Sequence, residues 1–260
     1  RARTGARLGS RFHSFADLAN DPASPAGRDM VWQSGNRLAQ QLNQLDTRLS
    51  AASSDAVTRL QGLAGEANDL LRQIADLNSR ILGSGGEAAA DLQDARDYAI
   101  DQLAEKLSVQ VISHSDGTVT VLGEGTTLVD RVNATQFTVS GSGSGVALTD
   151  AAGISVTAPG GSMGALLDYT NVRVPEIRAE LDQLASSLVI QVNTLHRTGY
   201  TTSGTTNTNF FDSSGVTAGS IKLTASLQAS SAAVAAGATN RAGDGAVAQQ
   251  IADLANTAIG

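Results

Sequence analysis

Residues 31–82 read VWQSGNRLAQQLNQLDTRLSAASSDAVTRLQGLAGEANDLLRQIADLNSRIL, and this stretch decides the fold. From Leu38 onward its apolar residues recur at intervals of three and four, with one extra four-residue step between Ala56 and Leu60. Such spacing places them on one face of an α-helix, and no proline interrupts the run. The pattern predicts one helix of about 75 Å, at about 1.5 Å per residue. A helix of this length is typical of a strut or of the spine of a bundle.

Composition excludes several classes of function. The chain has 260 residues, a net charge of -7, 3% aromatic residues and no cysteine. Nucleic acids and anionic membranes require a basic surface, so neither is an expected partner. Without cysteine there are no disulfides, thiol nucleophiles or thiolate metal sites. No apolar run reaches the roughly 18 residues of a membrane span. The start at Arg1 without Met, and a final helix pattern that stops at Gly260, predict a fragment of a longer protein.

Other helices are expected around the long one. Residues 12–19 form a short amphipathic pattern that ends at a turn before Pro22. Ser24-Pro25 supplies an N-cap and a first-turn proline, and Gly83–Gly86 ends the long helix. A second helix over 87–107, with Leu92, Ala95, Ala99, Leu103 and Leu107 on one face, should fold back antiparallel on the first.

The period changes from 3.6 to 2 after Ser108. Short strands are expected at 109–111, 118–121, 127–129, 136–139, 146–148 and 154–156, with a hairpin turn at 114–117. Helical spacing resumes near Ala165, and the stripe over 177–195 matches that of the long helix. The fold class is therefore α+β, a long-helix antiparallel bundle with a small, mainly antiparallel β domain inserted.

The domain boundaries follow from these elements. Residues 1–108 and 161–200 are expected to form a discontinuous helical bundle, and 109–160 the inserted β domain. Residues 201–260 hold a glycine- and threonine-rich loop, a strand at 220–224 and a terminal helix from residue 246. The sequence leaves the domain membership of this last part open.

One pentapeptide suggests an enzyme. Gly160-Gly161-Ser162-Met163-Gly164 matches the G-x-S-x-G nucleophile elbow, and Asp182 and His196 follow in hydrolase order. However, Asp182 and His196 lie 14 residues apart on one predicted helix, about 20 Å at about 1.5 Å per residue, and Asp168 is further away. They cannot orient one another, so we expect no catalytic residue here. The motif is instead interpreted as a glycine-rich return into the bundle.

Metal sites and cofactor sites are not expected either. Asp91, Asp94, Asp97 and Asp101 form a carboxylate row on the second helix, a pattern more typical of a solvated face that pairs with Arg and Lys. The three histidines, His13, His114 and His196, show no metal-ligand spacing. His196, at the end of its helix, is interpreted as a complement to the helix dipole.

Several local features together resemble one family, flagellar hook-associated protein 1. These features are Phe12 to Phe15 with Leu18-Ala19-Asn20-Asp21-Pro22, Asp94-Ala95-Arg96-Asp97, Asp116-Gly117, the segment from Gly160 to Leu167, and the block Leu181, Leu184-Ala185, Asn193, His196, Gly199-Tyr200 and Phe210-Phe211-Asp212. The chain departs from the family where its Gly-Tyr continues as Thr201-Thr202 in place of Asp-Leu. It also lacks the terminal helices that build the family's axial tube.

The resemblance implies a non-enzymatic structural subunit that joins the flagellar hook to the filament. It implies export by the flagellar secretion apparatus and an extracellular place in the flagellum. The implied partners are copies of itself in a ring, hook protein, the neighbouring junction protein, and an export chaperone at the missing C-terminus. Two alternatives remain open: another axial flagellar or coiled-coil adaptor protein, and a serine hydrolase built on Ser162.

Overall fold

We describe a computed structural model, in which residues 12–84, 87–156 and 159–256 are placed. The chain divides into two compact units: unit 1 comprises residues 1–49 and 177–260, and unit 2 comprises residues 50–176. Each unit has its own apolar core. No helix within the described residues has the length and hydropathy needed to cross a membrane.

The long helix is present and begins earlier than its apolar stripe. Helix α2 runs from Pro25 to Leu82, 58 residues without interruption. Ser24 caps it, because its Oγ accepts a hydrogen bond from Gly27 N at 3.1 Å. The boundary between the two units falls within α2, between Leu49 and Ser50. Its N-terminal part therefore contributes to one core and its C-terminal part to the other.

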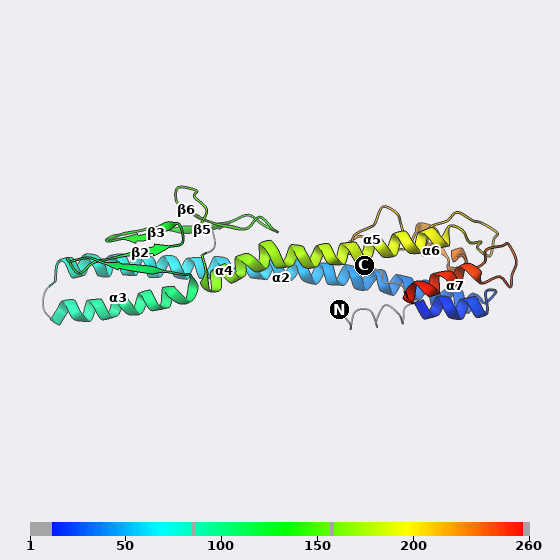
Figure 1. Cartoon of the computed structure of the whole chain (residues 1–260), viewed down its shortest axis with the longest axis horizontal. Coiled ribbons are helices and arrows are strands. Elements are labelled where there is room, and N and C mark those ends of the chain that lie inside the picture. The colour runs from blue at the N-terminus through cyan, green and yellow to red at the C-terminus, as the bar shows by residue number, and fades with distance from the viewer. Residues whose placement is uncertain (1–11, 85–86, 157–158, 257–260) are drawn as a thin grey trace. The chain divides into compact units, whose positions relative to one another are not determined.

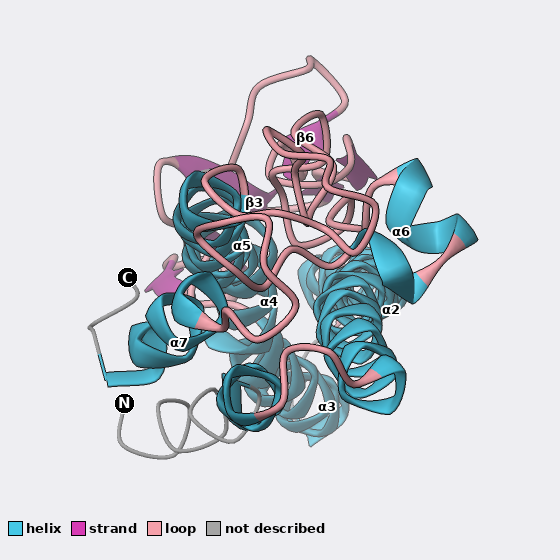
Figure 2. Cartoon of the chain, turned by 90° about the vertical axis from the view of Figure 1, so that its right-hand side faces the viewer, coloured by secondary structure: helices cyan, strands magenta, loops and turns pink. Residues whose placement is uncertain are grey.

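Unit 1 is built on α2 and α5, which lie side by side in Figure 1. Helix α5 runs from Val174 to His196, and residues 12–20 are also helical. The shorter helices are α6 (Ala225–Ala229), a 3-10 turn at Ser231–Ala233, α7 (Ala246–Asp253) and a 3-10 turn at Leu254–Asn256. Long loops connect them, as the view onto this unit shows (Figure 2). The core joins Leu42 of α2 and Leu188 of α5 to buried loop residues such as Phe210, Ile221 and Val234.

Unit 2 combines a helical pair with two small sheets. Helix α3, from Glu87 to Lys106, lies beside the C-terminal part of α2 (Figure 1). The four-stranded antiparallel sheet has the order β1-β2-β3-β4, and β5 pairs with β6. The strands are β1 (Gln110–Ser113), β2 (Val119–Gly123), β3 (Thr126–Asp130), β4 (Asn133–Ala134), β5 (Phe137–Ser140) and β6 (Ala147–Asp150). Helix α4 (Gly161–Asp168) and a π-helical turn (Tyr169–Arg173) lead back toward α5.

The compact units group the chain differently from the predicted domains. The β strands share one core with both helices of the pair, since Val121 and Leu128 pack with Leu71 of α2 and Leu103 of α3. Residues 109–160 therefore have no core separate from the helices beside them. Residues 201–260, whose membership was open, fall in unit 1.

Several expected details differ. Residues 220–224 make a single bridge, from Leu223 to Phe211, and residues 154–156 make only the bridge from Ser155 to Thr149. These segments follow glycine-rich turns and are too short to extend a ladder. Leu45 is 45% exposed and Ala95 is exposed, although both belong to predicted apolar stripes. The last part of the predicted terminal helix and Gly85-Gly86 lie outside the described residues.

Candidate functional site

The glycine-rich pentapeptide begins helix α4. Ser162 is exposed on its first turn, and its Oγ donates a 3.3 Å hydrogen bond to the Glu105 carbonyl oxygen. Gly160 and Gly161 both have positive φ, 65° and 54°. A Cβ on Gly161 would lie 2.7 Å from the Lys106 backbone, and one on Gly160 would lie 2.0 Å from Ser108 Oγ. Close approach to the end of α3 thus explains both glycines without any catalytic role.

The other members of the candidate triad are engaged elsewhere. Asp182 Oδ1 accepts a 2.8 Å hydrogen bond from Ala218 N and so holds the loop that follows Phe211. Asp168 accepts one from Arg173 Nε at 3.1 Å. His196 is fully buried, and both of its ring nitrogens have backbone partners. None of these groups is placed to activate a serine hydroxyl.

The geometry of His196 corrects the dipole interpretation. Its Nε2 accepts a hydrogen bond from Ala235 N at 2.9 Å, so Nδ1 carries the proton and donates to the Thr208 carbonyl oxygen at 2.7 Å. Burial lowers the pKa of His196 from 6.5 to about 4. The ring is neutral at pH 7 and cannot complement the helix dipole as a cation. It holds two loop segments against the end of α5 instead.

The carboxylate row on α3 faces solvent. Asp91, Asp94, Asp97 and Asp101 are all exposed, and Asp97 pairs with its neighbour Arg96 at 2.9 Å. Within the described residues no group of three or more His, Asp or Glu side chains is placed to hold a metal ion. His13 is exposed, while His114 Nε2 lies 2.8 Å from Thr120 Oγ1 in the hairpin.

A different set of polar residues, of which the sequence singled out Asn193 alone as part of a family motif, organises both units. Four helical asparagines each pair their side-chain amide with backbone N–H and C=O groups of a strand or loop. The four pairings are Asn68 with Phe137, Asn78 with Val119, Asn171 with Val146, and Asn193 with Phe210 and Phe211. We call these four residues the asparagine clamps. Their sequence signal is faint, a lone asparagine next to an apolar stripe.

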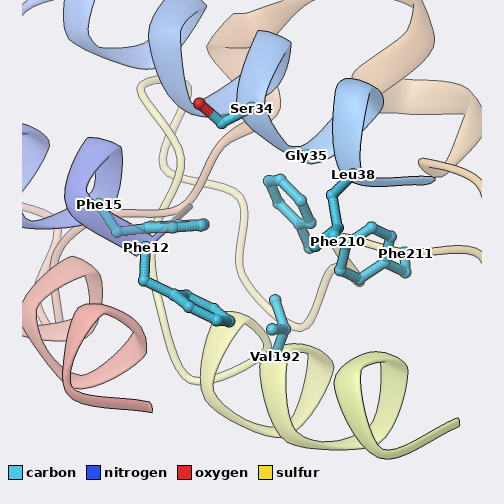
Figure 3. A pocket seen from close by; sticks show the side chains of 8 residues that line it. All are labelled: Phe12, Phe15, Ser34, Gly35, Leu38, Val192, Phe210 and Phe211. Carbon is cyan, nitrogen blue, oxygen red and sulfur yellow. The ribbon is translucent and has the colours of Figure 1, made fainter. Parts of the chain in front are cut away.

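The clamp at Asn193 sets the position of the aromatic core of unit 1. It places Phe210, whose ring lies against α2 beside Gly35 (Figure 3). The Phe210 ring centroid is 5.5 Å from that of Phe15 and 4.9 Å from that of Phe211. The cavity among these rings measures only about 20 Å³, enough for a single water molecule. This is a packing defect in the core and too small for a ligand.

These features define a class: α+β proteins built on one very long helix, whose polar side chains fasten strands and loops to the helical frame. The chain belongs to the family described as the flagellar hook-associated protein FlgK helical domain, whose model matches residues 2–211. The family predicted from the ordered motifs is thereby confirmed. The match ends just before Asp212.

Curated relatives agree with this assignment. The chain is 28% identical over 219 residues to flagellar hook-associated protein 1 of Salmonella typhimurium, covering 78% of this chain and 40% of that protein. It is 26% identical over 289 residues to the protein of the same name in Bacillus subtilis, covering 95% and 57%. The chain thus spans less than two thirds of the length of either relative.

A solved structure supports the fold. The flagellar hook junction protein FlgK from Burkholderia pseudomallei superimposes with a TM-score of 0.72 at 24% identity. The superposition covers 80% of this chain and 40% of that chain. The predicted α+β class is confirmed.

Proposed function

We propose that this chain is the helical portion of a structural subunit that joins the hook of the bacterial flagellum to its filament. The family match over residues 2–211 carries the proposal. Relatives that are 28% and 26% identical to this chain bear the name flagellar hook-associated protein 1. A rigid frame with clamped loops suits a subunit that transmits load.

The partners proposed here are those that the family resemblance implies. They are copies of the same protein in a ring, hook protein on one side and a second junction protein on the other. We also propose export by the flagellar secretion apparatus, an extracellular location, and binding by an export chaperone. The acidic net charge of -7 suits protein partners better than nucleic acid or membrane.

We further propose that the chain has no catalytic activity. Ser162 lies on a solvent-exposed turn, and the two residues that follow it in hydrolase order, Asp182 and His196, are committed to backbone hydrogen bonds. A serine nucleophile requires a base that can take its proton. The neutral imidazole of His196 cannot act as this base, because both of its ring nitrogens are hydrogen-bonded to backbone groups.

Localisation by a single-cysteine label tests the junction role. These 260 residues contain no cysteine, so Tyr98→Cys, at a position that is 65% exposed on α3, gives this part of the protein one accessible thiol. Intact flagella are treated with a maleimide–gold reagent and imaged by electron microscopy. We expect gold in a single band where hook meets filament.

The matched control is Leu188→Cys, at a fully buried position of α5, which should not react in folded protein. Gold distributed along the filament or over the cell body in the Tyr98→Cys strain would contradict the junction role.

A further inference from the structure

Arg28 is a buried cation without an anionic partner among the described residues. It lies on the first turn of α2 and is only 5% exposed. Its Nη2 donates to the Pro22 carbonyl oxygen at 2.9 Å, and its Nη1 donates to the Val234 carbonyl oxygen. Its Nε has no hydrogen-bond acceptor, and no carboxylate of the described residues forms an ion pair with it. Burying an unpaired charge is costly, so a site like this favours a compensating anion.

The arginine lines a pocket of about 330 Å³ in unit 1. The walls are the turn before α2, the segment 200–202 and the loop 237–244 that leads into α7. Arg241 lines the same pocket and is exposed, and no ion pair engages it within the part of the chain that the structure describes. Thr201, Thr202 and Asn240 add polar side chains to the wall. The pocket thus presents two cations and several polar side chains to one volume.

One carboxylate already lies in the pocket, but its own loop holds it. Asp244 accepts hydrogen bonds from Thr239 N at 2.7 Å, Thr239 Oγ1 at 2.6 Å and Ala246 N at 3.0 Å. These bonds lower its pKa to about 2, so it is ionised at neutral pH. It forms no ion pair with Arg28 or Arg241, and with two arginines against one aspartate the pocket keeps a net positive charge.

We propose that this pocket binds a carboxylate group, held between Arg28 and Arg241. A guanidinium fits a carboxylate because its planar array of N–H donors matches two oxygen atoms, and such charge-assisted bonds strengthen when water is excluded. The carboxylate comes either from a small organic acid or from an acidic side chain of a protein partner. This assignment is independent of the role at the hook–filament junction.

A substitution at Thr201 can supply a carboxylate to the pocket from the chain itself. It is 6% exposed, and its Oγ1 accepts a hydrogen bond from Thr205 N at 3.1 Å and bonds Ser203 Oγ at 2.9 Å. An aspartate at this position can accept both bonds and adds a fixed carboxylate beside the two arginines. Thr201→Asp should therefore raise the melting temperature and abolish binding of an added carboxylate.

The test is a titration of the whole chain with succinate, followed by ¹H–¹⁵N spectra and calibrated against sodium chloride at equal ionic strength. We expect succinate to shift the Arg28 Nε–H resonance and the amides of residues 200–202 and 239–242, and chloride to leave them in place. Arg241→Gln should weaken the apparent affinity about two- to five-fold, as expected for the loss of one exposed ion pair. Equal shifts with succinate and chloride, or unchanged succinate binding in Thr201→Asp, would overturn the proposal.

A second titration identifies the source of the carboxylate. The peptide Ac-Ser-Glu-Ser-NH₂ is compared with Ac-Ser-Gln-Ser-NH₂, which differs only in its charge. Tighter binding of the glutamate peptide than of succinate assigns the pocket to an acidic protein segment, and the reverse order assigns it to a small acid. Failure of both carboxylates to bind more tightly than the glutamine peptide refutes the site.

Discussion

A single asparagine side chain carries the same donor and acceptor as a peptide group, and this chain uses that property at each clamp. Asn68 both donates to the Phe137 carbonyl oxygen and accepts from Phe137 N, each at 2.8 Å. Asn171 likewise donates to the Val146 carbonyl oxygen and accepts from Val146 N. An edge strand or a loop is thus paired with a helix, whose own backbone groups are already used. Neither an ionised Asp nor an apolar Leu can replace Asn at these positions, because neither side chain offers both a donor and an acceptor.

The clamp at Asn78 gives the strongest prediction of this kind. Asn78 is fully buried, donates to the carbonyl oxygens of Val119 and Arg131, and accepts from Val119 N. Asn78→Leu keeps the size but leaves three backbone groups without a partner, and each buried unpaired group costs about 1–3 kcal/mol. We expect the free energy of unfolding of unit 2 to fall by about 3 kcal/mol or more, measured by urea denaturation.

The control is Gln73→Leu, which makes the same kind of change at an exposed position of α2. It should change the free energy of unfolding by less than about 0.5 kcal/mol. Equal effects of the two substitutions would show that the clamp does not stabilise the fold.

His196 makes the stability of unit 1 depend on pH. Its pKa is about 4 in the folded chain, below its ordinary value of 6.5, because burial disfavours the charged ring. The unfolded chain therefore binds the proton more readily. The stabilising contribution is complete above about pH 6.5 and is lost as the pH falls toward 4, by on the order of 3 kcal/mol.

The measurement compares the chain with His196→Gln, whose amide can make similar hydrogen bonds but does not titrate in this range. The difference in unfolding free energy between the two should shrink as the pH falls from 6.5 to 4. Parallel pH profiles would show that His196 does not titrate in this way.

Ser162→Ala should leave both folding and any assembly of the parent protein unchanged. The hydroxyl makes one long hydrogen bond at an exposed turn, so its removal changes the unfolding free energy by less than about 0.5 kcal/mol. Covalent labelling of Ser162 by a fluorophosphonate, together with ester hydrolysis that disappears in the alanine variant, would refute the non-catalytic assignment.

At the scale of elements, two glycines of α2 allow the effect of packing on stability to be measured apart from the effect of helix propensity. A Cβ on Gly35 would lie 2.5 and 2.6 Å from two ring carbons of the buried Phe210 side chain. A Cβ on Gly62 would meet nothing within 4 Å. Gly62→Ala should therefore raise the unfolding free energy by up to about 1 kcal/mol. Gly35→Ala should instead lower the unfolding free energy by about 1–3 kcal/mol relative to the unsubstituted chain, because the added methyl group overpacks the core.

Thermal melts of the two alanine variants measure this difference directly, since the sequence change is identical. An equal gain at both positions would mean that Phe210 moves aside freely, and that the clamp at Asn193 does not fix it.

Periodicity predicted the helices well because each buries a continuous stripe. Helix α3 ends within one residue of its expected end, and Ser24 caps α2 as expected. The stripe of α2 failed at Leu45, which is 45% exposed. A stripe predicts a helix, but it does not say how far along the helix each neighbour reaches.

The polar interior could not be predicted by the same reasoning. Arg28, Asn78, Arg96 and His196 are all buried, yet single polar residues carry no periodic signal. The long segment 201–245, in which the sequence predicted only a strand at 220–224, supplies Phe210, Ile221 and Val234 to a core. Its order depends on side-chain to backbone hydrogen bonds from distant helices, such as those of Asn43 to the Ala218 and Ile221 carbonyl oxygens.

At the scale of the whole molecule, we expect the 260-residue chain to be monomeric in solution. Its apolar stripes are largely buried within their own units, and exposed apolar side chains such as Met30, Tyr98 and Ile190 are scattered along the described sequence. Edge strand β1 has exposed Val111 and Ile112, but it is only four residues long. A contact of this size falls short of the roughly 1,000 Å² of a stable interface.

Light scattering on a size-exclusion column at high concentration tests this expectation. Like charges also disfavour self-association, although salt screens them beyond about 8 Å at physiological ionic strength. A stable dimer or ring from these residues would show that they drive assembly by themselves.

The asparagine clamps also affect where the protein degrades chemically over time. Asparagine is chemically labile, and its slow hydrolysis leaves aspartate, which cannot donate to a carbonyl oxygen. At Asn78, which lies in a helix, both the side-chain nitrogen and the side-chain oxygen are hydrogen-bonded. The side chain is therefore held away from the backbone nitrogen whose attack begins this hydrolysis. Asn207 is less protected, since it is exposed in a loop with a φ of 60°, and its side-chain oxygen accepts a hydrogen bond from the exposed Arg197 at 3.0 Å. Damage over time should therefore begin in the surface loops, while the clamps keep both cores intact until a unit first opens.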